Sequence, residues 1–500
     1  MEALGHPTYP TRYEFTHTIP QILADYSAKS AEELDAQRTN VRVAGRLMAI
    51  RLMGKAGFAH LQQAGQRLQI YVKKDAVGDK LFDLYKLFDL GDHTGVTGYL
   101  FRTRTGELSI HVEELVFLSK DLLPLPEKWH GLTDVELRYR QRYVDLVMNP
   151  EVRDVFVKRS RLVQSLRKSL DARGFIEVET PMMHAIAGGA VARPFVTHHN
   201  ALDMDLYLRI APELYLKRLT VGGLDRVYEI NRNFRNEGLG WRWNPEFTML
   251  EFYQAYADYR DVMQLTMELM EQSAIDVNGS TKAKWGDQEI DFTLANWKKM
   301  TMREAIIHFW PEAAGAKPEM REFTTHEGVA GLVRRVNAAR SHMAYNPAEP
   351  AGKTIANLFE TLAEEHLLQP TVIYEFPAAV SPLSKNKPDE PDWVERFEIF
   401  AGQMELSNGF SELNDPEEQR RRFELQIKER ERGDEEAHRM DEDYIRALSY
   451  GMPPAGGVGL GVDRFCMLLT DSHTIRDVIL FPLLRPEKND EGAGTEKTPA

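Results

Sequence analysis

Charged and aromatic residues are concentrated in one short stretch, FRNEGLGWRWNPEFT at residues 234–248. Side chains alternate along an extended chain, so Arg235 and Glu237 share one face of the incoming segment. Four residues share one face of the outgoing segment: Phe247, Met249, Glu251 and Tyr253. Gly238 and Gly240 lie between the segments and allow the chain to reverse. The pattern predicts a hairpin whose guanidinium, carboxylates and aromatic ring suit a ligand that combines phosphate, base and amine.

A second group of carboxylates lies in RFEIFAGQMELSNGFSELN, residues 396–414. A glycine can turn the chain in its middle, so Glu398 and Glu405 are predicted to face each other across an antiparallel pair. Two carboxylates beside a triphosphate form the oxygen-rich site that Mg²⁺ prefers, although paired glutamates on a surface strand are commoner than metal sites. Simple alternation puts Asn408 and Glu412 on the face opposite to Glu405, and a bulge near Asn408 would bring them together.

The third candidate is the glycine-rich stretch GGVGLGVDRFCMLLT, which begins at residue 456. No Lys-Ser or Lys-Thr follows the glycines, and no acidic residue follows a βαβ unit, so neither common nucleotide-binding glycine motif applies. Close backbone packing explains the glycines better. Arg464 near the start of the following apolar helix is placed to bind an outer phosphate.

A helix is predicted to begin near Pro212, because proline suits the first helical position. Glu213 in its first turn would favour the helix dipole, and a buried carboxylate there would hold an ammonium group. A surface helix glutamate is the simpler interpretation of the same residue.

The amino-terminal part of the chain predicts a small β-barrel. β-Rich segments separated by glycine-containing turns occupy residues 41–55, 58–62, 67–72, 95–101 and 108–119. A helical pattern at 80–90 interrupts them, and this order is typical of an OB-fold, which binds oligonucleotides. Phe58 and Tyr71 would offer stacking faces, and Gln69 and Glu107 would contact base edges.

Five regions follow from these patterns, in an α+β chain. They are an amino-terminal segment at 1–37, the barrel at 38–119, a proline-containing linker at 120–134, a large domain at 135–486 with a helical insertion at about 278–353, and a disordered tail at 487–500.

Composition restricts the class of protein. The net charge is −14 over 500 residues, which argues against a chain that coats nucleic acid indiscriminately, although residues 38–119 hold 12 Lys and Arg against 8 Asp and Glu. The single cysteine, Cys466, excludes an internal disulfide and fits a reducing compartment. No apolar run approaches the roughly 18 residues of a membrane span and no signal sequence is recognisable, so we expect a cytoplasmic protein without a membrane contact.

Three stretches together resemble a known family. GFIEVETP, FRNEG…NPEFTMLEF and GLGVDRF are similar, in the right order, to motifs 1, 2 and 3 of the class II aminoacyl-tRNA synthetases. With GGAVARPFVTHHNALDMDLYLRIAPELYLKRL and SNGFSELNDP, the resemblance narrows to the bacterial lysyl-tRNA synthetases and covers roughly Thr16 to Pro486. It implies an OB-fold anticodon-binding domain, a catalytic antiparallel sheet flanked by helices, and a homodimer built through motif 1.

The resemblance assigns the ATP site. It implies that Arg235 grips the α-phosphate, that Glu237 and Asn244 contact the adenosine, and that Phe247 stacks on adenine while Arg464 covers it and reaches the γ-phosphate. Arg235 and Arg464 would then be the catalytic residues, since no side chain acts as a nucleophile in the attack of the lysine carboxylate on ATP. The lysyl-adenylate would be transferred to the end of tRNA(Lys).

The same resemblance assigns the metal and amino-acid sites. Glu398 and Glu405 match the carboxylates that hold Mg²⁺ against the ATP phosphates. The residues around the ε-ammonium of L-lysine would be Glu251, Tyr253 and Glu412. Glu213 and the backbone near Gly189 would receive the α-ammonium, and Arg235 and Asn408 would orient the carboxylate.

One position departs from the family, which commonly has histidine where this chain has Trp243, two residues after Trp241. Stacking or a contact with the tRNA acceptor end is the expectation there. Three other functions remain open: an aspartyl- or asparaginyl-tRNA synthetase, a ligase that attaches lysine to a protein, and an inactive RNA-binding regulator. The first would need a cationic pocket, the second lacks the barrel, and the third conflicts with the retained arginines and glutamates.

Overall fold

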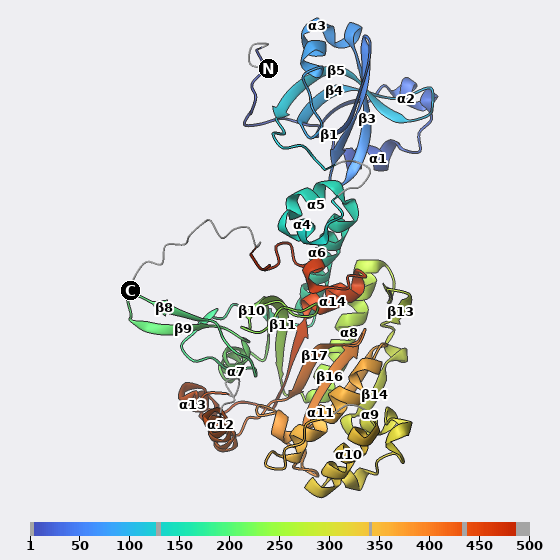
Figure 1. The fold of residues 1–500 in the computed structure, drawn as a ribbon. Coiled ribbons are helices and arrows are strands. Elements are labelled where there is room, and N and C mark those ends of the chain that lie inside the picture. Colours follow the sequence, from blue (N-terminus) through green and yellow to red (C-terminus); the bar gives the residue numbers. More distant parts are fainter. Residues whose placement is uncertain (1–4, 127–131, 340–342, 433–437, 487–500) are drawn as a thin grey trace. The chain divides into compact units, whose positions relative to one another are not determined.

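The computed structural model describes residues 5–126, 132–339, 343–432 and 438–486 (Figure 1). The chain divides into two compact units, Met1–Asp154 and Val155–Ala500. The predicted tail at 487–500 lies outside the described residues, as do five positions of the predicted linker.

The first unit contains a closed barrel with the strand order β1-β2-β3-β5-β4. Its strands are β1 Asn40–Met53, β2 Ala56–Gln63, β3 Gln66–Lys73, β4 His93–Arg102 and β5 Leu108–Ser119. Alternate residues, such as Val41 and Val43 on β1, point into a continuous apolar core. Helix α3, Lys74–Tyr85, crosses between β3 and β4. The predicted OB-fold is confirmed.

Short helices complete the first unit. Helices α1 (Ile19–Tyr26) and α2 (Ala31–Gln37) each begin with a capping box, in which a side-chain oxygen of Thr18 or Ser30 accepts from a backbone NH of the first turn. Both helices contribute to the barrel core. Three helices follow the barrel: α4 Val135–Arg140, α5 Arg142–Met148 and α6 Pro150–Asp171, the last of which runs on into the second unit.

The second unit is built on an eight-stranded sheet of order β14-β15-β16-β17-β18-β11-β10-β6. From one edge to the other its strands are β14 Lys298–Thr301, β15 Thr371–Pro377, β16 Trp393–Ala401, β17 Met404–Ser411, β18 Ala455–Gly461, β11 Glu246–Ala255, β10 Arg226–Phe234 and β6 Ile176–Glu177. Pairing is antiparallel except at the two edges, where β6 and β14 run parallel to their neighbours. The predicted α+β class is confirmed.

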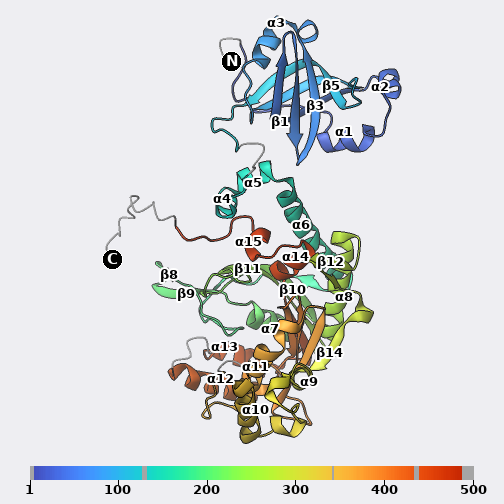
Figure 2. The same cartoon turned by 45° about the vertical axis from the view of Figure 1, so that its right-hand side comes forward.

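Helices cover one face of this sheet. Leu250 and Phe252 of β11 belong to the same buried cluster as residues of α6, α8 (Tyr259–Asn278) and α14 (Val462–Leu469). Figure 2 shows these helices beside the sheet. Because side chains alternate along β11, Glu251 and Tyr253 project from the opposite face. That opposite face carries the candidate site.

The predicted helical insertion contains strands as well as helices. Between α8 and α11 the chain forms β12 Lys282–Trp285, β13 Gln288–Asp291, the edge strand β14, α9 Met302–His308 and α10 His326–Ala339. With α11, Ala351–Leu362, the two helices enclose a separate apolar core. The other elements are the small sheet β7 Met183–His184, β8 Val196–His199 and β9 Met204–Leu208, and the helices α7 Glu213–Val221, α12 Pro416–Glu431, α13 Glu442–Ser449 and α15 Ile475–Val478.

Candidate active site

The floor of the site is the face of three central strands that lies opposite to the face covered by α6, α8 and α14. Two rows of paired residues cross β11, β18 and β17: Tyr253–Gly457–Phe410 and Glu251–Gly459–Asn408. The central strand contributes only glycine to each row, so the side chains on either side can occupy the space above it. A cavity of about 590 Å³ lies there. The predicted reason for these glycines, close packing, holds at Gly457, where a Cβ would overlap Glu412 Oε1 and the Tyr253 ring.

The predicted hairpin supplies one wall of this cavity. β10 and β11 pair with Phe234 opposite Glu246, and the four predicted residues of β11, Phe247, Met249, Glu251 and Tyr253, all line the cavity. Arg235 follows β10 directly and places its guanidinium 5.0 Å from the centre of the Phe247 ring. Burial lowers the pKa of Arg235, and its Nε has no hydrogen-bond partner among the described residues.

The turn of the hairpin differs from the prediction. Neither Gly238 nor Gly240 adopts a positive φ, so the reversal does not depend on the conformational freedom of glycine. Gly240 is needed for another reason, because a Cβ there would lie 2.5 Å from the ring of Trp243. The turn from Phe234 to Glu246 is long, so the reversal is spread over many residues.

Polar groups of the turn border the cavity mouth. Glu237 lines the cavity, and Asn244 donates from Nδ2 to the backbone oxygen of Glu246 at 2.6 Å. The Oδ1 of Asn244 is buried without a hydrogen-bond partner in the described part of the chain. The Arg242 guanidinium lies 4.9 Å from the ring centre of Trp241 and 5.0 Å from that of Trp243. Trp243 also lines the cavity.

Helix α14 brings Arg464 to the same cavity. Its Nη1 donates to the backbone oxygen of Glu405 at 2.8 Å and lies 3.6 Å from the Glu405 carboxylate. The preceding residue, Asp463, is buried and fixes the helix, because it accepts from the Thr248 backbone NH at 2.6 Å and pairs with Arg159 at 2.6 Å. Arg464 is therefore held at the cavity by a buried anchor.

The predicted pairing of the two metal carboxylates is wrong in register. Glu398 pairs with Asn408, whereas Glu405 pairs with Phe400, and a β-bulge leaves Leu406 unpaired between them. The bulge lies two residues before the predicted position, and it turns Glu405 to the same face as Asn408 and Glu398. Glu398 and Glu405 both line a second cavity of about 490 Å³, which Arg464 also lines.

These two carboxylates fit a metal that takes few protein ligands. Arg396 donates to Glu398 at 2.6 Å, but burial outweighs this contact and the nearby Glu405 adds to it, so the pKa of Glu398 rises to about 8. Among the described residues no group of three or more His, Cys, Asp and Glu has the spacing of a metal site. A divalent cation shared with phosphate oxygens needs no such group.

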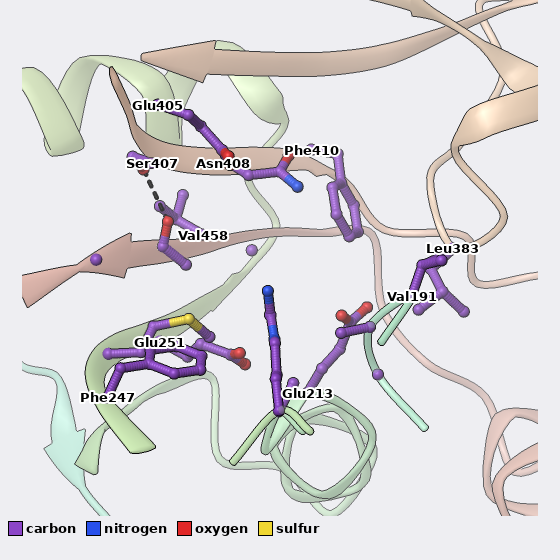
Figure 3. Close-up of a pocket in the computed structure, with 18 of the residues that line it drawn as sticks. Val191, Glu213, Phe247, Glu251, Leu383, Glu405, Ser407, Asn408, Phe410 and Val458 are labelled. Atoms are coloured by element: carbon purple, nitrogen blue, oxygen red, sulfur yellow. Dashed lines mark hydrogen bonds between the residues drawn. The ribbon is translucent and has the colours of Figure 1, made fainter. Parts of the chain in front are cut away.

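Acidic groups meet at the other end of the cavity. Figure 3 shows the carboxylates of Glu213 and Glu251 pointing into it, with Phe247 to one side and Leu383 to the other. The Tyr253 hydroxyl donates to Glu251 at 3.2 Å. Burial raises the pKa of Glu251 well above its ordinary value, and nearby Glu213 adds to that rise. Carboxyl groups with a raised pKa favour a cationic ligand, because a nearby positive charge lowers the pKa and stabilises the carboxylate form.

Of the other residues predicted to bind lysine, two line the cavity and one lies behind it. Gly189 lines the cavity beside Glu213, and a Cβ there would lie 3.1 Å from the Cβ of Glu213. Glu412 is buried behind Gly457 and is not among the residues that line the cavity. Asn408 lines the cavity and accepts from Arg396 Nε at 3.1 Å.

Comparison with known proteins decides the family. A family model for class II tRNA synthetases (D, K and N) matches residues 134–485, and one for an OB-fold nucleic acid binding domain matches residues 41–118. The chain belongs to the class II tRNA synthetases. It is similar to the lysine–tRNA ligase of Halalkalibacterium halodurans, with 52% identity over 97% of this chain and 94% of that protein. It is also similar to the lysine–tRNA ligase of Syntrophomonas wolfei, with 54% identity over 98% of this chain and 96% of that protein. The heat-inducible lysine–tRNA ligase of Escherichia coli is 50% identical over 96% of this chain and 93% of that protein.

The barrel of this class II synthetase presents an aromatic and polar surface. Phe58 and Tyr71 are opposite each other on β2 and β3, with ring centres 4.8 Å apart, and both are partly exposed. Gln69 donates to Glu107 at 2.8 Å, and Glu107 also lies 3.1 Å from His60 Nε2. The four predicted barrel residues therefore form one continuous surface.

Sequence reasoning missed several residues around the synthetase site, among them Arg396 and Lys217. Lys217 is completely buried on α7 and pairs with both Glu213 and Glu412. The spacing of four residues from Glu213 to Lys217 in PELYLK is the signal that predicts such a pair. No helix among the described ranges is both long and apolar enough to cross a membrane.

Proposed function

We propose that this chain is a lysine–tRNA ligase, which activates L-lysine with ATP and transfers it to tRNA(Lys). One observation carries the proposal. The cavity holds an arginine over an aromatic ring, Arg235 on Phe247, and two buried carboxylates, Glu213 and Glu251, that point into it. An aspartyl- or asparaginyl-tRNA synthetase would need a cation or an amide donor where these carboxylates lie.

ATP occupies the arginine end in this proposal. Phe247 stacks on the adenine, and Arg235 binds the α-phosphate, where its free Nε supplies an unsatisfied donor. Glu237 and Asn244 contact the adenosine from the turn, and the free Oδ1 of Asn244 accepts a hydrogen bond. Arg464 reaches the outer phosphates from the start of α14. A buried polar atom without a partner is costly, so ligand contacts at these atoms are favourable.

Enzymes of this family depend on ATP and generally need a divalent metal. We infer that the metal is Mg²⁺ and that Glu398 and Glu405 hold it. When bound, it neutralises charge on the phosphates that leave as pyrophosphate. Arg396 keeps Glu398 oriented through a 2.6 Å hydrogen bond.

Lysine binds along the rest of the cavity. Glu251 and Tyr253 bind the ε-ammonium with Glu412 behind them, while Glu213 and the Gly189 backbone bind the α-ammonium. Arg235 and Asn408 then orient the carboxylate towards the α-phosphorus. The carboxylate attacks in line, pyrophosphate departs, and Arg235 stabilises the charge that develops on the α-phosphate.

Lysine-dependent exchange of pyrophosphate into ATP tests this function. We expect exchange with lysine in the presence of Mg²⁺, and none above background with aspartate or asparagine, because their carboxylate or amide side chains meet Glu251 and Glu213. The measurement is incorporation of labelled pyrophosphate into ATP with each amino acid in turn. Absence of exchange with lysine from an enzyme that binds ATP would contradict the proposal.

The barrel binds the anticodon of tRNA(Lys) in this proposal, with Phe58 stacking on a base and Gln69 and Glu107 contacting base edges. The variant Phe58→Ala is expected to lower the efficiency of tRNA charging by roughly 5- to 150-fold, since a lost base stack costs about 1 to 3 kcal/mol. Exchange without tRNA should stay unchanged. Phe15→Ala, which removes another exposed aromatic of the same unit, is the matched control. Equal loss in both assays would mean that Phe58 only supports the fold.

We also infer a homodimer that works in the cytoplasm, where tRNA is charged for protein synthesis. The exposed apolar residue Ile176 lies in the segment that matches motif 1, Met182 and Met183 follow that segment directly, and exposed apolar residues of this kind favour a protein contact. Light scattering of the purified enzyme would measure the mass. A mass of one chain at micromolar concentration would contradict the dimer.

A further inference from the structure

Lys217 carries an ammonium group enclosed entirely by protein. Its side chain is fully buried on α7, and its Nζ lies 2.5 Å from Glu213 Oε1. The same Nζ forms an ion pair with Glu412 Oε2, and it lies 5.2 Å from the centre of the Phe410 ring. Lys217 does not line the cavity. It therefore touches two acidic residues of the proposed lysine site without meeting the lysine itself.

The two glutamates that Lys217 joins lead towards different ends of the substrate. Glu213 lines the cavity beside Gly189, where the α-ammonium is proposed to bind. Glu412 directs its second oxygen, Oε1, towards Gly457 and the ring of Tyr253, beside the proposed ε-ammonium position. Oε1 is buried and has no hydrogen-bond partner in the described residues. An unpaired buried carboxylate oxygen next to a cavity is a site for a donor from a ligand.

We propose that Lys217 is a positioning residue for the substrate: its ammonium fixes Glu213 and Glu412 in the orientations in which they receive the α- and ε-ammonium groups of lysine. The inference rests on the proposed function and deepens it. It explains why a buried cation is present in a site that binds a cation.

Charge balance supports this role. The site contains three buried carboxylates, Glu213, Glu251 and Glu412, and one buried ammonium. Lysine brings two ammonium groups and one carboxylate, and Arg235 faces that carboxylate, so the amino-acid site would hold four positive and four negative charges. Without Lys217 one carboxylate would remain unbalanced in a buried site, which is costly unless it binds a proton.

The ionisation of the glutamates depends on Lys217. Burial raises the pKa of Glu412 to about 8, and Lys217 opposes that rise. The pKa of Glu213 is likewise raised by burial and held down by Lys217. The other titratable or charged groups that interact with Glu213, Glu412 or Lys217 are Glu251 and Tyr253 on β11, Arg396 on β16, Tyr444 on α13, and His438. Removing the Lys217 charge would raise both glutamate pKa values further, so the carboxylates would ionise only at higher pH.

The variant Lys217→Met keeps most of the length of the side chain and removes the charge. We expect its KM for lysine in pyrophosphate exchange to rise at least about tenfold at pH 7, with the KM for ATP within about twofold of the wild-type value. Between pH 7 and 8.5 the lysine KM of the variant should fall more steeply than that of the wild type, because Glu213 and Glu412 regain their charge. A lysine KM that is unchanged, or that rises together with the ATP KM at every pH, would overturn the inference.

Three further variants make the test independent of folding and of general effects. Lys284→Met removes an exposed lysine on β12 and should leave both constants unchanged. If Lys217→Met does not fold, we would compare Glu412→Gln with the double variant Lys217→Met/Glu412→Gln. The double variant has one fewer unpaired carboxylate than Lys217→Met, because Glu412 is also replaced. Because Lys217 also holds Glu213, the double variant should still have the higher lysine KM, and equal values would overturn the inference. Failure of lysine exchange in the wild type would instead contradict the proposed function.

Discussion

Glutamine in place of Glu405 is expected to lower lysine-dependent pyrophosphate exchange by roughly 10- to 1000-fold, because a lost charged metal ligand costs a few kcal/mol and each ~1.4 kcal/mol is tenfold in rate. Glutamine has the same shape as glutamate, and the Glu405 side chain is 42% exposed, so the substitution leaves no cavity and no buried unpaired charge. The melting temperature of the variant should therefore stay close to that of the wild type. Exchange rates over a series of Mg²⁺ concentrations measure the effect.

The matched control is Glu289→Gln, which removes an exposed carboxylate of β13 that pairs only at the surface with Lys282 at 2.6 Å. Pairs of that kind contribute little to stability, so exchange and melting temperature should both be unchanged. For Glu405→Gln, a higher Mg²⁺ requirement than the wild type would accompany the lower rate. Unaltered exchange would mean that Glu405 does not hold a metal.

The face of each strand was predictable where one side is buried. On β11 the prediction of a shared face for Phe247, Met249, Glu251 and Tyr253 is correct, because Leu250 and Phe252 must enter the apolar core and the alternation leaves no choice for the rest. The barrel strands followed from the same rule. Burial of one face specifies which way a strand points.

The register between β16 and β17 was not predictable in the same way. The bulge at Leu406 depends on how two strands pair, and neither strand contains a sequence signal that distinguishes residue 406 from residue 408. The predicted bulge near Asn408 would bring Glu405 and Asn408 to one face, as the observed bulge does, but the observed bulge lies at Leu406. The strands β12 to β14 were missed for a related reason, since each has only four residues and shows too little alternation to be recognised.

Lys217 illustrates a second limit. A glutamate and a lysine four residues apart on a helix usually form an exposed pair, and that is what the spacing alone predicts. Here the helix is buried by its contacts with β10, β11 and α13, and Glu412 arrives from a segment about two hundred residues later. Long-range packing converts an ordinary pair into part of a site.

Removing the charge of Glu412 is expected to give the second large effect, a weaker binding of lysine without a change in the binding of ATP. The side chain of lysine ends in an ammonium ion, and a buried ammonium is costly without carboxylates around it. Glu412 has one oxygen paired with Lys217 and the other beside Tyr253, 1% of its surface is exposed, and its pKa is raised to about 8 by burial. Its carboxylate is therefore ready to ionise when a second cation enters. Glu412→Gln cannot ionise, and it also leaves Lys217 with Glu213 as its only carboxylate.

We therefore expect Glu412→Gln to raise the KM for lysine by roughly 10- to 100-fold, as for the loss of one charge-assisted buried contact, with much less effect on the KM for ATP. The lysine KM of the wild type should rise at low pH, because Glu412 takes up a proton as the pH falls through its pKa of about 8, and the variant should lose that part of the dependence. Glu424→Gln on the exposed face of α12 is the control. Arginine, with its larger planar head, and ornithine, one methylene shorter, should both remain poor substrates, because the site measures length as well as charge. A variant whose ATP constant alone changed would place Glu412 outside the lysine site, even if the enzyme charged lysine.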